Sequence, residues 1–199
     1  IINNCETFSN LNNMLLFVGL GNPTPNSQNN RHNIGFKVVD AINKKFGLSK
    51  QKPKFKGLLT TGNIGEKKIY VIKPLTFMNN SGICIRELLE YFKIEAEDVI
   101  VFHDDLDVEF GKIKVKFGGS SAGHNGIASI DKFIGKDYSR VRIGIGKPEN
   151  KVSASDYVLN DFTEDEQKHL EKITNNIIES ISILIDKKLD LFSSSVNNN

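Results

Sequence analysis

The chain has 199 residues, of which 39% are hydrophobic and 25% are charged. This composition excludes a wholly disordered chain, because it supplies enough apolar side chains for the core of one domain. The formal net charge of +2 excludes nucleic-acid binding through overall charge, so any basic surface must be local.

The predicted elements alternate between short apolar strands and amphipathic helices. Strands are predicted, in chain order, at 14–20, 55–62, 68–72, 99–102, 112–117 and 141–145. A first helix is predicted at 31–46, with Gly47 as its stop, and Ser81 is expected to cap a second helix. Thr163 and Glu166 form a capping box for a long final helix. This alternation predicts the α/β class, with a mixed twisted sheet and helices on both of its faces.

Both ends of the chain differ from this alternating region, because they are polar and lack periodicity. We therefore expect a single domain at 14–192 between polar tails at 1–13 and 193–199. Two cysteines, Cys5 and Cys84, are too few for a disulfide scaffold and indicate free thiols in a reducing, cytoplasmic compartment. The chain begins at Ile1, so a removed targeting segment would allow an organelle instead. No apolar run approaches the ~20 residues of a membrane span.

Four polar segments follow predicted strands, where α/β proteins build their sites. In the first, Gly19 and Gly21 resemble a dinucleotide loop only weakly, because the third glycine is absent and two prolines oppose a helix start. The glycines instead permit a tight turn that leaves Asn22 at a rim. His32 opens the following helix, either as an exposed polar residue or as a titratable group near neutral pH.

The second segment, 73–82, carries two large apolar side chains in a polar loop. Phe77 and Met78 are either plugs of the core or a platform for a ring or an apolar side chain. Asn79 beside them has a carboxamide that can donate and accept hydrogen bonds at once.

The third segment, 103–107, places three carboxylates directly after a buried strand. They indicate a metal site, a charge partner for a histidine, or a solvated acidic turn. Because the four histidines show no close ligand spacing, we predict no metal, and no motif indicates a cofactor.

The fourth segment, 118–126, contains a match to Gly-x-Ser-x-Gly around Ser121. A nucleophile elbow needs a strand, a sharp turn and an immediate helix, with an aspartate and then a histidine downstream. Only His169 follows His124, and it lies in a polar helical stretch, so a glycine loop that lets a ligand approach closely fits better. A serine esterase using Ser121 remains an alternative.

A basic stripe follows one predicted strand. Lys112, Lys114 and Lys116 alternate, so their side chains face the same way about 6.6 Å apart, near the phosphate repeat of one nucleic-acid strand. Arg140 and Arg142 make a similar pair on another strand. The stripe is either a phosphate-binding surface or a solvated polar face of the sheet.

Taken together, these segments resemble the bacterial-type peptidyl-tRNA hydrolase family. They occur in the order found in that family and cover about residues 14–190: Val18–Pro23, Arg31–Phe36, Lys73–Asn79 with Ser81 and Gly82, His103–Asp107 with Gly111, Gly118 and Gly119 with Gly123–Gly126, and Arg140–Gly146.

The resemblance implies a single α/β domain, esterase action on the bond between a peptide and the tRNA 3′ ribose, and no metal or cofactor. By matching positions, His32 falls on the catalytic histidine and Asp104 on the carboxylate that holds it. The expected site asparagines are Asn22, Asn79 and Asn125. Substrate-binding candidates are Phe77, which lines the peptide groove in the family, with Met78, His124 and Ser27, which stands where relatives carry a contacting tyrosine. The tRNA 5′ phosphate is expected at Lys114 and Arg142, extended by Lys112 and Lys116.

The chemistry expected from these positions has no covalent step. His32 deprotonates a water that attacks the ester carbonyl, and Asp104 fixes its tautomer. Asn79 and Asn125 bind the oxyanion with N–H groups of the glycine loop. A monomer that acts on peptidyl-tRNA in translation is therefore expected. The alternatives are a catalytically idle member that binds RNA or protein, and the serine esterase.

Overall fold

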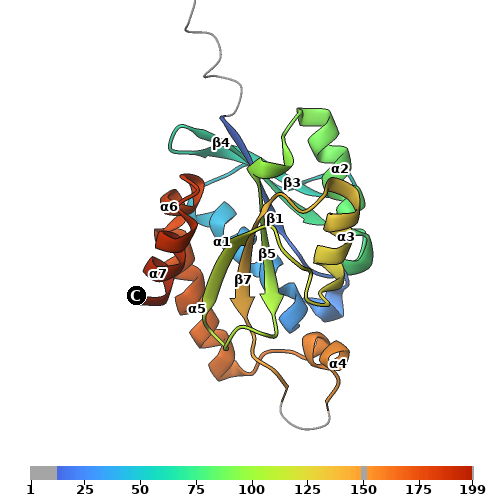
Figure 1. The fold of residues 1–199 in the computed structure, drawn as a ribbon, viewed down its shortest axis with the longest axis vertical. Helices are drawn as coiled ribbons and strands as arrows, with labels where there is room; N and C mark the ends of the chain where they lie inside the picture. Colours follow the sequence, from blue (N-terminus) through green and yellow to red (C-terminus); the bar gives the residue numbers. More distant parts are fainter. Residues whose placement is uncertain (1–12, 149–151, 199) are drawn as a thin grey trace, which may run out of the picture.

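The computed structural model describes residues 13–148 and 152–198, and within them a seven-stranded mixed sheet forms the centre of the fold (Figure 1). Its strand order is β2-β3-β4-β1-β5-β7-β6. The strands are β1 Met14–Gly19, β2 Lys52–Lys54, β3 Gly57–Ile64, β4 Lys67–Pro74, β5 Val99–Asp105, β6 Ile113–Phe117 and β7 Ser139–Gly144. The central strands β4, β1, β5 and β7 are parallel, whereas β2, β3 and β6 run antiparallel to their neighbours.

Helices cover both faces of this sheet (Figure 1). They are α1 Ile34–Lys45, α2 Ser81–Phe92, α3 Asn125–Ile134, α4 Ala154–Leu159, α5 Glu164–Glu179, α6 Ile181–Ile185 and α7 Leu189–Asn198. Short 3₁₀ turns add η1 Pro25–Ser27, η2 Arg31–Asn33, η3 Met78–Asn80 and η4 Ala96–Asp98. Side chains of α2 and α3 belong to one core cluster, and side chains of α1, α5, α6 and α7 belong to the other. The α/β fold expected from the sequence is confirmed.

The continuous apolar sequence of β1 follows from its place between these two cores. Leu15 and Phe17 pack into the cluster with α1 and α5, while Leu16 and Val18 pack into the cluster with α2 and α3. Successive side chains of a strand point to opposite faces, so a strand covered on both sides must be apolar throughout.

Close packing at one glycine brings the segment that carries His32 next to the end of β5. A Cβ on Gly35, in the first turn of α1, would lie 2.3 Å from the carbonyl oxygen of Phe102 in β5. Glycine therefore lets α1 approach the sheet closely enough for η2, directly before it, to meet the end of β5.

The expected C-terminal tail at 193–199 is wrong for residues 193–198, which belong to α7. Val196 is buried, and the Asn197 side chain accepts a hydrogen bond from the Ile113 N–H and donates one to the Ile113 carbonyl, at 2.9 and 2.8 Å. These bonds satisfy polar backbone groups of the edge strand β6, a role that polar composition does not reveal. The tail expected at 1–13 lies outside the described residues except for Asn13, whose carbonyl accepts from the Lys68 N–H.

Ser81 does not cap α2 as expected. It lies inside the helix, and its hydroxyl donates to the Met78 carbonyl at 2.9 Å, because the preceding turn η3 presents that carbonyl to it. The capping box of Thr163 and Glu166 is confirmed at the start of α5. Burial raises the pKa of the Cys84 thiol to about 12, so this thiol is an inert part of the core. Across the described helices, none has the length and apolarity to span a membrane.

The parallel strands bring their carboxyl ends to one edge of the sheet. The chain leaves β1 toward Asn22, β4 toward Phe77 and β5 after Asp105, and α4 lies beyond the ends of β5 and β7 (Figure 1). Segments that are far apart in the sequence therefore meet at this edge.

Candidate active site

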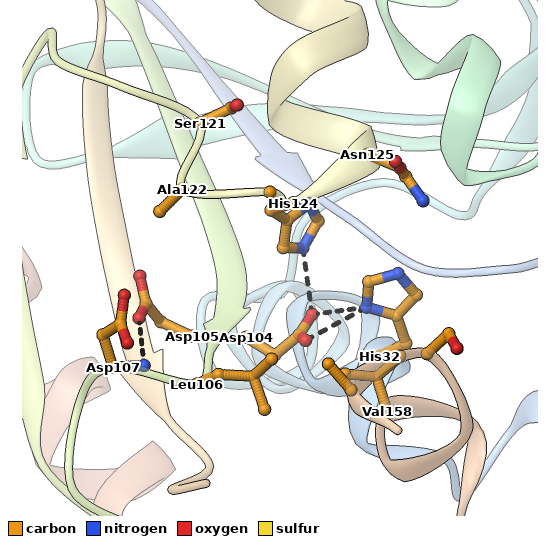
Figure 2. Close-up of a pocket in the computed structure, with 13 residues that line it drawn as sticks. His32, Asp104, Asp105, Leu106, Asp107, Ser121, Ala122, His124, Asn125 and Val158 are labelled. Carbon is orange, nitrogen blue, oxygen red and sulfur yellow. Dashed lines mark hydrogen bonds and ion pairs between the residues drawn. The ribbon is translucent and has the colours of Figure 1, made fainter.

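His32 and Asp104 form the centre of this edge (Figure 2). His32 lies in η2, and its Nδ1 is 2.9 and 3.0 Å from the two carboxylate oxygens of Asp104, near the end of β5. Since an ionised carboxylate only accepts hydrogen bonds, Nδ1 carries the proton and donates it. The Nε2 lone pair of His32 is therefore available to take a proton from a bound molecule.

His124 makes a second hydrogen bond to the same carboxylate. Its Nε2 lies 3.1 Å from Asp104 Oδ1, while its Nδ1 accepts from the backbone N–H groups of Gly126 and Ile127 at the start of α3. A nitrogen that accepts two N–H groups has no proton, so the proton must be on Nε2 and points at Asp104. His124 was expected to bind substrate. It lines the cavity, but both of its ring nitrogens are already engaged within the protein.

The electrostatics of the site keep Asp104 ionised. Burial by itself would raise the pKa of Asp104, but the electrostatic interactions and hydrogen bonds with His124 and His32 hold it well below its usual range. Beneath them, burial and the neighbouring His124 lower the pKa of His103 to about 3. His103 is thus neutral, and its Nδ1 donates to the Asp104 carbonyl at 2.7 Å.

The possible ligand atoms of His32, Asp104 and His124 lie within 4.8 Å of one another, a grouping that could hold a metal ion. Spacing along the chain could not predict it, because the three residues come from three separate segments. The facing atoms are, however, two N–H donors and their common acceptor. A metal ion would need lone pairs where this arrangement has protons, so hydrogen bonding accounts for the group better.

Two adjoining cavities open around His32. The first has a volume of about 210 Å³ and is lined by His32, Asp104, Asp105, Leu106, Asp107, Ser121, Ala122, Gly123, His124, Asn125, Ala154, Ser155 and Val158. The second, of about 270 Å³, is lined by Asn22, His32, Phe77, Met78, Asn79, Asn125, Ser155, Val158 and Leu159. His32 and Asn125 line both cavities. Figure 2 shows the second ring nitrogen of His32 on the side facing Asn125.

The structure separates the two interpretations of Phe77 and Met78. Phe77 is 56% exposed and lies at a positive φ of 59°, so its ring stands at the mouth of the second cavity. Met78 is 4% exposed and belongs to the core beneath it. Asn22 Oδ1 accepts from the Met78 N–H at 3.1 Å, which leaves the amide N–H groups of Asn22 for a ligand.

Ser27 is not brought to the cavities. It is buried, its hydroxyl shares a hydrogen bond with the Thr24 hydroxyl, and it lines neither cavity. The opposite wall comes from α4, through Ser155, Val158 and Leu159, which the sequence analysis missed. The only signal in the sequence was the capping pattern from Ser153 to Asp156 ahead of a short apolar pair, and six residues are too few to show a helical period.

Ser121 lacks the surroundings of a nucleophile. The strand β6 ends at Phe117 and α3 begins at Asn125, so no sharp strand-to-helix turn carries Ser121. Figure 2 shows its hydroxyl turned away from His124. The hydrogen bond that joins Ser121 to His124 runs from the His124 N–H to the Ser121 carbonyl, at 2.9 Å, and among the described residues none joins the Ser121 hydroxyl to a histidine.

The basic stripe is paired across two strands. Lys114 lies opposite Arg142 and Lys116 opposite Arg140 in the antiparallel pairing of β6 with β7, while Lys112 precedes β6 and is exposed. Arg140 is 1% exposed and pairs with Asp131 at 2.7 Å, so it supports the fold. Arg142 donates through Nε to Asp105 at 2.6 Å, and partial burial with the charges of Arg142 and Arg140 lowers the pKa of Lys116.

The fold and the site define a single-domain α/β protein with a histidine–aspartate pair suited to general base chemistry. A family model described as peptidyl-tRNA hydrolase matches residues 16–199. The chain is 80% identical over 185 residues to a peptidyl-tRNA hydrolase of Pelagibacter ubique, covering 93% of this chain and 100% of that protein. It is 42% identical over 184 residues to one of Nitrobacter winogradskyi, covering 92% and 91%. The crystal structure of peptidyl-tRNA hydrolase from Acinetobacter baumannii has a TM-score of 0.86 at 34% identity and covers 93% of this chain and 95% of its own. The chain belongs to the peptidyl-tRNA hydrolase family.

Proposed function

We propose that this protein hydrolyses the ester between a peptide and the 3′ ribose of tRNA, with water activated by His32. The observation that carries the mechanism is the hydrogen bond from His32 Nδ1 to Asp104, which leaves Nε2 unprotonated and open to the cavities. A general base must lie within reach of the proton it removes, and an imidazole can accept that proton near neutral pH. Asp104 holds the ring and stabilises the imidazolium that forms.

The oxyanion of the tetrahedral intermediate needs donors on the side of the carbonyl away from the water. Asn125 and Asn79 both line the second cavity beside His32, and their carboxamides are the donors we assign to it. Removal of one such donor typically raises the barrier by ~3 kcal/mol. The amide N–H groups of Asn22 are placed to donate to a peptide carbonyl, and the exposed ring of Phe77 supplies an apolar surface for a peptide side chain.

The tRNA is assigned to the other end of the site. Lys114 and Arg142 face the same side of the sheet on paired strands, with Lys112 and Lys116 beside them. The strand β7 is the neighbour of β5, which carries Asp104, so phosphate on these cations would lie next to the proposed catalytic pair. Asn22 follows β1, which lies on the opposite side of β5 from β7. A peptide bound at Asn22 would therefore extend away from the tRNA.

Peptide release from a purified peptidyl-tRNA tests this function. Wild type should release the peptide, and His32→Ala should lose nearly all kcat while keeping the fold. His169→Asn is the matched control, because His169 is exposed on α5 and outside both cavities. An inactive wild type on intact substrate would favour the binding protein instead. Full activity in His32→Ala would refute the base, and loss in Ser121→Ala with a missing acyl-enzyme would revive the serine esterase.

A further inference from the structure

Arg31, the residue directly before His32, has a dense set of contacts that the chemistry above does not use. Its side chain is buried, with 6% of the residue exposed. The Nη2 atom donates to both carboxylate oxygens of Glu166, at 2.8 and 2.7 Å. The Nη1 atom donates to the carbonyls of Asn160 and Asp161. All of these partners lie on the chain segment that leaves α4 and enters α5.

The guanidinium of Arg31 also stacks on two rings from the same segment. Its central carbon lies 4.5 Å from the ring centroid of Tyr157, in α4, and 5.1 Å from that of Phe162. The Tyr157 hydroxyl donates to the Ile145 carbonyl at 2.9 Å, which ties the far side of this ring to the end of β7. Arg31 thus contacts α4 by stacking on Tyr157, while its ion pair with Glu166 joins it to α5.

Backbone hydrogen bonds join the same two segments. The Arg31 N–H donates to the Asn160 carbonyl at 3.0 Å, and the Phe162 N–H donates to the Asn29 carbonyl at 3.2 Å. The turn that carries His32 and the chain that follows α4 are therefore held in one register.

This attachment adds to the contacts that otherwise fix α4, which are the packing of Tyr157 and Val158 against the core and the hydrogen bond from the Tyr157 hydroxyl to the Ile145 carbonyl. The helix has six residues and none of them is buried. A helix this short has marginal stability of its own, so tertiary contacts must hold it. Yet Val158 and Leu159 of α4 form the wall of the second cavity facing Phe77, and Figure 2 shows Val158 beside His32.

We propose that Arg31 is a positioning residue that holds α4 against the His32 turn and so sets the substrate-facing wall formed by Val158 and Leu159. This inference rests on the proposed function. Because Asp104 and not Arg31 orients the imidazole, the clamp governs how well the substrate is held and leaves proton transfer unchanged. Arginine is required because only its planar fork can bind a carboxylate through two bonds while it stacks on rings.

The test compares Arg31→Lys and Tyr157→Leu with wild type, using peptidyl-tRNA as substrate. Arg31→Lys keeps the positive charge beside Glu166 but loses the fork and the stack, and Tyr157→Leu removes the stack from the side of α4. Arg86→Lys is the control, because Arg86 forms an exposed ion pair with Glu90 on α2. Both test variants should lower kcat/KM by between about tenfold and 100-fold, the scale of a small misplacement. The loss should appear in KM, with kcat and its pH profile unchanged, as expected for binding shared by ground and transition states.

Amide hydrogen exchange supplies a readout independent of catalysis. Exchange should become faster at residues 154–162 in both test variants and stay unchanged in the control. A fall in kcat without a rise in KM would mean a smaller folded fraction and would overturn the proposal. A KM within twofold of wild type in both variants would also overturn it. An active wild type with unaffected variants refutes the clamp alone, whereas a wild type that is inactive on intact substrate refutes the proposed function and the clamp with it.

Discussion

Replacement of Asp104 by asparagine changes one acceptor of the central hydrogen-bond group into a donor. In the wild type, Asp104 accepts from His32 Nδ1 at 2.9 Å and from His124 Nε2 at 3.1 Å. His124 reaches only Oδ1, whereas Oδ2 lies 3.0 Å from His32 Nδ1, so an asparagine that keeps its oxygen at the Oδ1 position places its NH₂ group against His32 Nδ1. Because the α3 backbone fixes the proton of His124 on Nε2, the oxygen is taken by His124 and the NH₂ group faces His32.

The consequence for His32 is a change of tautomer. Its Nδ1 must become an acceptor, so the proton moves to Nε2 and the base that faces the cavity is lost. In a catalyst with a histidine–aspartate pair, the same substitution of aspartate by asparagine puts the histidine in the wrong tautomer and lowers kcat by about 10⁴-fold. That factor corresponds to about 5.5 kcal/mol of barrier. We therefore expect Asp104→Asn to fold and to bind substrate with nearly unchanged KM, while kcat falls by about three to four orders of magnitude.

Single-turnover and steady-state peptide release measure this loss, with Asp107→Asn as the control in the same loop. Asp107 also lines the first cavity, but its carboxylate pairs with Lys147 at the surface, and among the described residues no hydrogen bond or ion pair joins that carboxylate to His32 or His124. A value of kcat in Asp104→Asn above a tenth of wild type would refute the tautomer argument. So would a loss of equal size in Asp107→Asn.

Three further outcomes are expected. Lys114→Ala should weaken tRNA binding and reduce the slope of log affinity against log salt by about one phosphate contact, and an unchanged slope would remove Lys114 from the tRNA surface. The pKa of the buried His103 is lowered to about 3. Between that pH and about 6.5, the unfolded chain therefore binds one more proton than the folded protein. Each pH unit of acidification in this window lowers the free energy of unfolding by about 1.4 kcal/mol. His103→Gln should remove that contribution in urea melts taken across this window, and an identical pH slope would show that His103 is protonated in the fold. Asn197→Ala should cost about 1–3 kcal/mol by leaving the Ile113 N–H without its acceptor, while the Ile113 carbonyl keeps the hydrogen bond from the Ser193 hydroxyl. Asn175→Ala, an exposed change on α5, should cost almost nothing.

Local patterns predicted an element correctly where the pattern follows directly from the surroundings of that element. The apolar run of β1 indicated a strand covered on both faces, and Thr163 with Glu166 marked the start of α5. The pattern failed at Ser81, because Ser81 lies inside α2 and its hydroxyl donates to the Met78 carbonyl in the preceding turn instead of accepting from a helix N–H. It failed again at residues 193–198, whose polar side chains serve the edge strand β6.

The order of motifs along the chain was enough to indicate the family and to single out His32, Asp104 and the three asparagines. Their assembly was decided by the tertiary structure. The parallel strands β1, β4 and β5 end at one edge, and Gly35 lets the His32 turn reach Asp104. Only there does His124 become the second donor to that carboxylate, and only there does Arg31 stack on Tyr157 of α4, the helix that lines the second cavity. Residue types and local spacing carry the chemistry that each side chain can perform, but contacts between segments separated by 20 to 135 residues depend on how the whole sheet is ordered.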